Sequence, residues 1–386
     1  MDFAWQQYRR EVMAEIEGLL SERQLFLYDM VRYHLGLQLY PTRPGQGSHA
    51  VGWPPPATPQ GLAQPSGWEG LAEAPAPRPE APAVLPVPPG PAALAMPTPG
   101  KMLRPILCLL SCQAIGGDWR RALPAATALE LLHNFSLVHD DIQDRSSIRH
   151  HRPTVWQMWG EGQAINVGDA FFALAHLAAE ALGERGVGPA DILGVLALLD
   201  RAALALCEGQ VSDLAYEERT EVTLEEYLAM VRAKTGALMG SAAACGALLG
   251  GAPEAAQEAF LLFGEELGIA FQVHDDILGL WGNPEATGKP VGKDLWSGKK
   301  GYPVVYALAQ ACDADREFLG QIQSGHLSAA RVSRFLDILE RTGARQEGQQ
   351  AVEEYRLRAL ARLDDLALTA QGRRELEEFT LYLVSA

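Results

Sequence analysis

Two pairs of adjacent aspartates are the residues of this sequence whose types and spacing could do chemistry. The first pair, Asp140-Asp141, is followed by Asp144. On a helix, Asp140 and Asp144 lie one turn apart on the same face, where like charges repel. A cation is therefore expected to compensate them. Mg²⁺ is the natural candidate, because it binds one or two carboxylates and completes its shell with water and substrate phosphate oxygens.

The second pair, Asp275-Asp276, ends another apolar segment of the chain. Buried carboxylates are unfavourable unless they are paired or metal-bound, so two acidic helix ends in one protein are hard to explain by structure alone. If the two ends face each other, they form a cage for several Mg²⁺ ions and a polyphosphate. The predicted metal-binding residues are Asp140, Asp141, Asp144, Asp275 and Asp276.

Basic residues cluster at three further places. Lys101 and Arg104 lie three residues apart at a predicted helix start, which suits a diphosphate. Lys234 lies in a segment of small residues, and a lysine-rich loop that includes Lys289 follows the second aspartate pair. Taken singly, these are ordinary solvated cations. Beside an acidic metal site they make sense if a metal–phosphate complex lies between them.

The elements that position these residues are predicted to be helices. From residue 100 to 386 the apolar residues recur with helical spacing, and turn signals such as Gly116-Gly117-Asp118 separate the segments. This pattern predicts an all-α bundle that forms the catalytic core. Residues 1–39 are expected to form N-terminal helices of the bundle. Residues 40–99 are rich in proline and are expected to be a disordered, flexible insertion, with a proline-rich docking ligand as the alternative.

The composition excludes several classes of protein. A net charge of -16 argues against general nucleic-acid binding. The five cysteines form no CxxC pair and lie in apolar surroundings, which favours buried free thiols in a reducing compartment. The first residues lack the pattern of a signal peptide, and no uninterrupted apolar run is long enough to span a membrane. We expect a cytoplasmic protein without a transmembrane segment.

Together, these motifs resemble those of the trans-isoprenyl diphosphate synthases, the polyprenyl synthetases. The matching stretches are GKMLRP at 100–105, ELLHNFSLVHDDIQD at 130–144, RHHRPT at 149–154, GQVSDL at 209–214, KTG at 234–236, FQVHDDILG at 271–279 and TGKPVGKDL at 287–295. They occur in the family's order, and helices at both ends extend the match over nearly everything but the insertion. The resemblance implies an isoprenoid synthase-type helical bundle around a central active-site cavity, and a homodimer.

The resemblance also implies a reaction, the Mg²⁺-dependent condensation of isopentenyl diphosphate with an allylic diphosphate. Asp140, Asp144 and Asp275 would bind Mg²⁺, about three ions per site with diphosphate bound. The residues implied to hold the allylic diphosphate are Arg149, Lys234, Gln272 and Lys289. Those implied to hold isopentenyl diphosphate are Lys101, Arg104 and His133. Thr235 and Gln272 would place oxygen dipoles near the allylic cation, and the departing diphosphate would take the final proton.

The sequence departs from the family pattern at two positions. The family usually has two arginines after the first motif, and in this sequence the two positions are occupied by Arg149 and His150. A histidine neutral at pH 7 is expected to bind isopentenyl diphosphate more weakly. The second motif usually ends in aspartate, and here that position is Gly279. Asp275 and Asp276 are expected to suffice.

Product length in this family depends on bulk beneath the first aspartate motif. Phe135 lies five residues before Asp140, about 7.5 Å along a helix axis. An aromatic ring there would close the floor of the cavity, which favours a short product, geranylgeranyl (C20) before farnesyl (C15). The alternative is that Phe135 is simply a core residue.

Three other functions share some of these features. A non-catalytic subunit of a heteromeric synthase would keep the fold and lose aspartates, yet Asp140, Asp144 and Asp275 are present. A class I terpene cyclase needs a different second motif and has no use for a second set of cations. A di-iron bundle would need two Glu-x-x-His motifs, and Glu130-x-x-His133 is the one that we find.

Overall fold

The computed structural model describes residues 5–38, 100–150, 152–282, 299–320 and 329–385. The expected insertion at 40–99 and the predicted ligand Lys289 lie outside these ranges, so both remain predictions. Within the described ranges the helices are joined by turns and one short hairpin, which confirms the predicted all-α class. The hairpin pairs β1 (Ile148–Arg149) with β2 (Arg152–Pro153) in antiparallel register.

Fifteen α-helices are described. In chain order they are α1 (Gln6–Leu20), α2 (Phe26–His34), α3 (Leu103–Ile115), α4 (Leu123–Gln143), α5 (Val155–Trp159), α6 (Glu161–Glu180), α7 (Pro189–Glu218), α8 (Leu224–Val231), α9 (Ala237–Leu249), α10 (Glu254–Trp281), α13 (Tyr302–Gln310), α14 (Asp313–Gly320), α15 (Ala329–Arg341), α16 (Ala344–Ala361) and α17 (Ala370–Ser385). Two 3₁₀ turns, Trp119–Ala122 and Ala181–Arg185, and a π-helical turn, Arg232–Gly236, lie between them.

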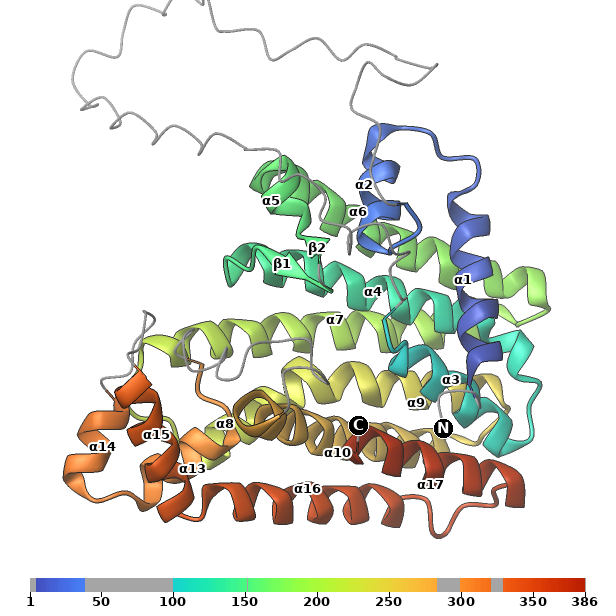
Figure 1. Ribbon diagram of the computed structural model, residues 1–386. Coiled ribbons are helices and arrows are strands. Elements are labelled where there is room, and N and C mark those ends of the chain that lie inside the picture. Colours follow the sequence, from blue (N-terminus) through green and yellow to red (C-terminus); the bar gives the residue numbers. More distant parts are fainter. Residues whose placement is uncertain (1–4, 39–99, 151, 283–298, 321–328, 386) are drawn as a thin grey trace, which may run out of the picture.

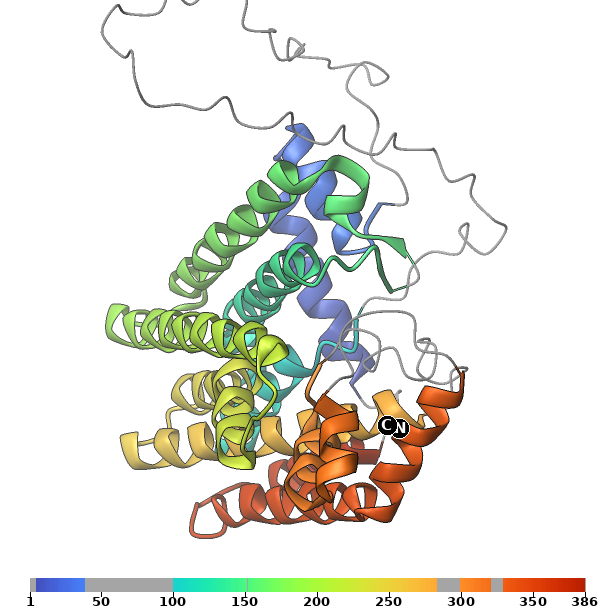
Figure 2. The same ribbon diagram turned by 90° about the vertical axis from the view of Figure 1, so that its left-hand side faces the viewer.

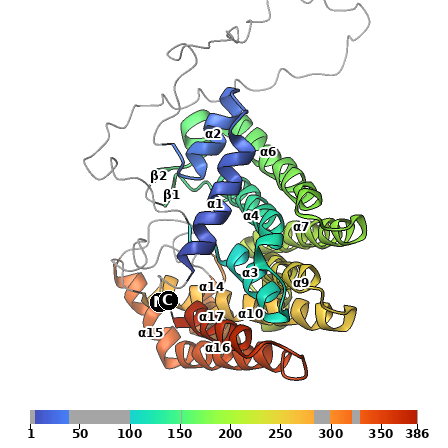
Figure 3. The same cartoon turned by 90° about the vertical axis from the view of Figure 1, so that its right-hand side faces the viewer.

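The long helices stack in layers, with α16 and α17 at one side, then α10 and α9, then α7 and α4, and α6 with α2 at the other side (Figure 1). The helices α13, α14 and α15 gather at one end of the bundle (Figure 1), and this end faces the viewer when the molecule is turned by 90° (Figure 2). The two ends of the described chain lie side by side in every view, as Figure 3 shows from the opposite side. Trp5 joins them by packing edge-on against Phe379 and Tyr382, with ring centroids 5.3 Å away in both cases.

The centre of the bundle is α9, which is made almost entirely of small and apolar residues and is buried on nearly all sides. A Cβ at Gly246 would lie 2.0 Å from the Cys108 carbonyl oxygen, so α3 and α9 touch backbone to backbone. A Cβ at Gly264 would lie 2.4 Å from the Met239 carbonyl oxygen, so α10 approaches α9 as closely. These contacts fix α3 and α10, the helix that carries the second aspartate motif, directly against the central helix of the core.

The structure bears on two expectations from composition, the burial of the cysteines and the absence of a membrane span. Cys108, Cys112 and Cys245 are buried free thiols as predicted, but Cys207 and Cys312 are exposed. Cys207 lies on the outer face of α7, and Cys312 lies in the turn between α13 and α14. Among the described residues, one helical stretch, Glu161–Arg185, has the length and apolar composition of a membrane span, and 44% of its most apolar window is buried inside the protein. Buried helices in the core of a soluble protein can have the same length and composition. The expectation that no segment spans a membrane stays a prediction.

Candidate active site

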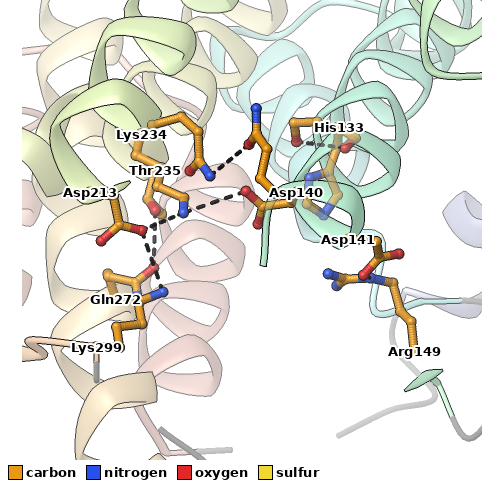
Figure 4. A network of polar contacts seen from close by, with 12 residues as sticks. His133, Asp140, Asp141, Arg149, Asp213, Lys234, Thr235, Gln272 and Lys299 are labelled. Carbon is orange, nitrogen blue, oxygen red and sulfur yellow. Dashed lines mark hydrogen bonds and ion pairs between the residues drawn. The ribbon is translucent and has the colours of Figure 1, made fainter. Parts of the chain in front are cut away.

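The first aspartate motif lies at the end of α4, where its carboxylates take two directions. Asp140 faces α7 and the π-helical turn, whereas Asp141 points the other way, toward Arg149 (Figure 4). Asp141 is only 2% exposed and accepts a hydrogen bond from Arg149 Nε at 2.9 Å. Burial raises the pKa of Asp141 to about 6, although Arg149 opposes the shift. Asp144 caps the helix end and is exposed.

The two aspartates of the second pair, on α10, also differ in their exposure. Asp275 is exposed, and Asp276 is 7% exposed. The Asp276 carboxylate accepts hydrogen bonds from the Tyr227 hydroxyl, from the Tyr302 backbone N–H at 2.8 Å and from Gln272 Nε2 at 2.9 Å. In each pair, therefore, the second aspartate is buried and hydrogen-bonded to the protein, whereas the first is more accessible.

Lys234 connects the two sides of the site. Its Nζ lies 2.6 Å from Asp213 Oδ2 on α7 and 3.6 Å from Asp140 Oδ1 on α4 (Figure 4). Lys299 lies 3.7 Å from the same Asp213 oxygen. Burial alone would raise the pKa of Asp213, but Lys299 and Lys234 reverse this and lower the pKa. The sequence motifs do not assign Asp213 a role, although the GQVSDL stretch that contains it is a signal in the sequence.

Local backbone geometry explains why these side chains meet. Residues Arg232–Gly236 form a π-helical turn, a feature common at functional sites. A Cβ at Gly209 would lie 2.4 Å from Lys234 N, and one at Gly268 would lie 2.7 Å from Gly236 Cα. Glycine at both positions lets α7 and α10 press against this turn. Thr235 consequently donates a hydrogen bond to Gln272 Oε1 at 3.0 Å.

The residues predicted to hold isopentenyl diphosphate come from α3, α4 and the hairpin. Burial lowers the pKa of Arg104 to about 10, and Glu130 opposes the shift. Burial also lowers the pKa of His133, with Arg104 adding to the effect, so His133 is neutral at pH 7. Lys101 is exposed just before α3. His150 is exposed at the hairpin turn with a left-handed φ of 49°.

Phe135 is half-buried on α4 within a small aromatic group. Its ring centroid lies 5.0 Å from that of His139 and 5.4 Å from that of Phe172 on α6. Phe172 in turn contacts His176, whose Nε2 lies 2.8 Å from Asp200 Oδ1 on α7. The ring is thus braced from two helices, which suits both a cavity floor and a plain core residue.

The donor set fits a hard cation. The exposed carboxylates of Asp144 and Asp275 and the partly exposed one of Asp140 supply oxygen ligands of the kind that Mg²⁺ prefers. Among the residues that the structure describes, no three His, Cys, Asp or Glu side chains converge on one point. Mg²⁺ commonly binds through one or two carboxylates, with water and phosphate oxygens completing its shell.

An all-α bundle in which two aspartate motifs flank a lysine-bearing π-helical turn defines the class of the protein, a prenyltransferase of the isoprenoid synthase fold. Residues 91–339 match the family model described as polyprenyl synthetase, and the chain belongs to this family. The predicted family, fold and trans-prenyltransferase class are therefore confirmed.

Curated relatives and a solved structure support the same family. The chain is 38% identical over 289 residues to (2E,6E)-farnesyl diphosphate synthase of Mycobacterium tuberculosis (strain ATCC 25618 / H37Rv), covering 74% of this chain and 79% of that protein. It is 40% identical over 267 residues to geranylgeranyl diphosphate synthase of the same strain, covering 69% and 75%. The crystal structure of polyprenyl synthetase from Streptomyces coelicolor A3(2) superposes with a TM-score of 0.77 at 29% identity, covering 98% of both chains.

Proposed function

We propose that this protein is a Mg²⁺-dependent short-chain synthase that condenses isopentenyl diphosphate with an allylic diphosphate, making geranylgeranyl diphosphate (C20) in preference to farnesyl diphosphate (C15). The observation that carries the proposal is the position of Lys234. Its ammonium lies between carboxylates of α4 and α7, beside Lys299. Such a mixed cluster of carboxylates and cations suits a metal-bound diphosphate.

The allylic substrate would bind between the two aspartate motifs. Asp140, Asp144 and Asp275 would hold Mg²⁺, which when bound supplies positive charge against the leaving diphosphate. Lys234 supplies further positive charge from the π-helical turn, and Arg149 does so from the hairpin, where Asp141 fixes its orientation. Preorganised charges of this kind stabilise the transition state because they need no reorganisation as the C–O bond breaks.

The second substrate would bind at the Arg104 and His133 side of α4, with Lys101 and His150 near the rim. A neutral His133 donates one hydrogen bond without adding charge. The Thr235 and Gln272 oxygens lie on the opposite side, where they would stabilise the allylic cation. Holding the homoallylic double bond against that cation converts a bimolecular step into an effectively intramolecular one.

Product length is proposed from Phe135. The ring lies on α4 below Asp140 and is braced by Phe172, so it is suited to stop a growing chain. Relatives that make either C15 or C20 products are about equally similar to this chain. The C20 preference therefore depends on the position of this ring.

One assay tests the proposal. The purified protein is incubated with Mg²⁺, isopentenyl diphosphate and allylic primers of several lengths, and products are separated by chain length. We expect elongated diphosphates ending at C20, and none when Mg²⁺ is removed with a chelator. Hydrocarbon or alcohol terpenes would point to a cyclase. No product from any primer would contradict a synthase that acts alone.

We also propose a homodimer. Leu193, Leu204 and Val211 are 66%, 63% and 67% exposed, and their spacing places them on one face of α7. Leu177 on the neighbouring α6 is 40% exposed. Several large apolar side chains on adjacent helices form the kind of surface that a second copy covers.

A further inference from the structure

The two aspartates of the second motif have different surroundings, and this difference carries an inference about Asp276. Asp275 is exposed, as a metal ligand must be before metal and substrate bind. Asp276 is 7% exposed, and both of its oxygens are occupied. Oδ2 accepts from the Tyr227 hydroxyl and the Tyr302 N–H, and Oδ1 accepts from Gln272 Nε2.

These bonds tie together three helices. Tyr227 lies on α8, and Tyr302 is the first residue of α13. The carboxylate therefore lies at the positive end of the α13 helix dipole, which favours its negative charge. A Cβ at Gly301 would lie 2.9 Å from Asp276 Oδ2, so the chain before α13 passes directly over the carboxylate. To reach a metal, Asp276 would have to rotate away and leave two buried donors without partners, at about 1–3 kcal/mol each.

The bond to Gln272 matters for the reaction. Because Asp276 can only accept, it requires the NH₂ end of the Gln272 amide. The carbonyl end, Oε1, is thereby turned to Thr235, 3.0 Å from its Oγ1. Asp276 thus decides which end of the amide dipole lies beside Thr235 and Lys234, on the side of the site where positive charge develops on the substrate.

We propose that Asp276 is a positioning residue and not a metal ligand: it orients the Gln272 amide and anchors the start of α13. This inference rests on the proposed function, since the orientation of Gln272 matters for turnover only if an allylic cation forms beside it.

The test uses the isosteric variant Asp276→Asn in the full chain. The introduced amide keeps an oxygen for Tyr227 and Tyr302 but places an NH₂ against Gln272, so the Gln272 amide turns over and presents its own NH₂ to Thr235. We expect kcat for prenyl transfer to fall about 10- to 100-fold, the scale of a misplaced group. Calorimetric binding of inorganic diphosphate in the presence of Mg²⁺ is expected to stay unchanged.

A matched control and a rescue make the test specific. Asp275→Asn, one residue away, is expected to weaken Mg²⁺-dependent diphosphate binding. Gln272→Glu alone is expected to lower kcat, because two carboxylates would face each other. Combined with Asp276→Asn it is expected to restore kcat, because the Gln272→Glu carboxylate accepts from the new amide and again presents an oxygen to Thr235. Thermal melting of each variant checks that it is folded.

The outcomes separate the two proposals. Unchanged diphosphate binding by Asp276→Asn, together with rescue by the double variant, supports the inference. Weakened binding matching that of Asp275→Asn, or a double variant no faster than Asp276→Asn, overturns it. A wild-type chain that binds Mg²⁺ and diphosphate without making any prenyl product contradicts the proposed function, and the binding comparison still decides whether Asp276 is a metal ligand.

Discussion

At the residue scale, side chains that are adjacent in the sequence have separate tasks. Asp140 is directed at Lys234, and Asp141 is buried against Arg149. Consecutive residues on a helix lie about 100° apart, so one of them can face the site while the other faces the protein interior. Phe135 and His34 are two further residues whose surroundings lead to a testable expectation.

Replacing Phe135 with alanine tests its role in product length. If the ring closes the floor, Phe135→Ala is expected to shift products beyond C20, because the growing chain can extend into the vacated volume. Chromatography of dephosphorylated products measures the shift. Phe135→Tyr, which retains the ring, is expected to leave the distribution unchanged. If Phe135→Ala gives the same products as the wild type, Phe135 is only a core residue.

His34 lies at the end of α2 among cationic neighbours. Its ring packs edge-on against Phe171, with centroids 5.4 Å apart. Burial lowers the pKa of His34 to about 3, and Arg149 and His150 add to the shift, while a hydrogen bond with Asn134 opposes it. The folded state therefore holds this imidazole neutral.

This shift predicts a pH dependence of stability. Between pH 6.5 and about 3 the unfolded chain binds a proton at His34 that the folded chain does not. The free energy of unfolding should therefore fall as the pH drops through this range, by up to about 2 kcal/mol at pH 5, an upper value because water screens the exposed part of the residue. Urea unfolding of the wild type and His34→Gln at neutral pH and at pH 5 measures it. Equal pH dependence in both proteins would contradict the prediction.

At the element scale, the site depends on how closely helices approach the π-helical turn. Gly209 on α7 packs on the Lys234 backbone, and Gly268 on α10 packs on Gly236. Neither contact can be predicted from helical periodicity. By local preference alone, an isolated glycine inside a helix is unfavourable. The tertiary contact explains its presence.

Gly209→Ala is expected to push α7 away from the turn and to displace Lys234. The added methyl would lie 2.4 Å from Lys234 N, and overpacking of this kind destabilises proteins by about 1–3 kcal/mol. We expect a lower melting temperature and a lower kcat. Gly18→Ala is the matched control, since no atom lies within 4 Å of the added methyl on α1. It should be neutral or stabilising. A fully active and stable Gly209→Ala protein would contradict the close-packing argument.

At the scale of the whole molecule, the described parts of the site lie on helices packed around two clusters of buried apolar residues, and α10 contributes to both clusters. Apolar residues of α1 and α2, including Val12 and Met30, belong to the same core as α3, α4 and α9. The outer faces of α6 and α7 are the exception, since they expose large apolar side chains.

The proposed dimer can be tested on this face. Leu204→Glu places a charge in the proposed interface and is expected to shift the protein from dimer to monomer, as measured by light scattering during size-exclusion chromatography. Leu357→Glu on α16, where the native side chain is also exposed at 53%, is the control and should leave the mass unchanged. A wild-type monomer, or a Leu204→Glu dimer, would count against an interface on α7.

The sequence by itself determined the class of fold, the family and the location of both aspartate motifs. Helical periodicity and the spacing of Asp140 and Asp144 are local properties, so they can be read without tertiary structure. Burial and pairing are not local. Only tertiary packing decided that α8 and the start of α13 enclose Asp276 while Asp275 stays open. The packing of α7 against the π-helical turn likewise decided that Asp213 pairs with Lys234, twenty-one residues further along the chain. A carboxylate's role depends on which donors reach it, and those donors come from distant segments brought together by the fold.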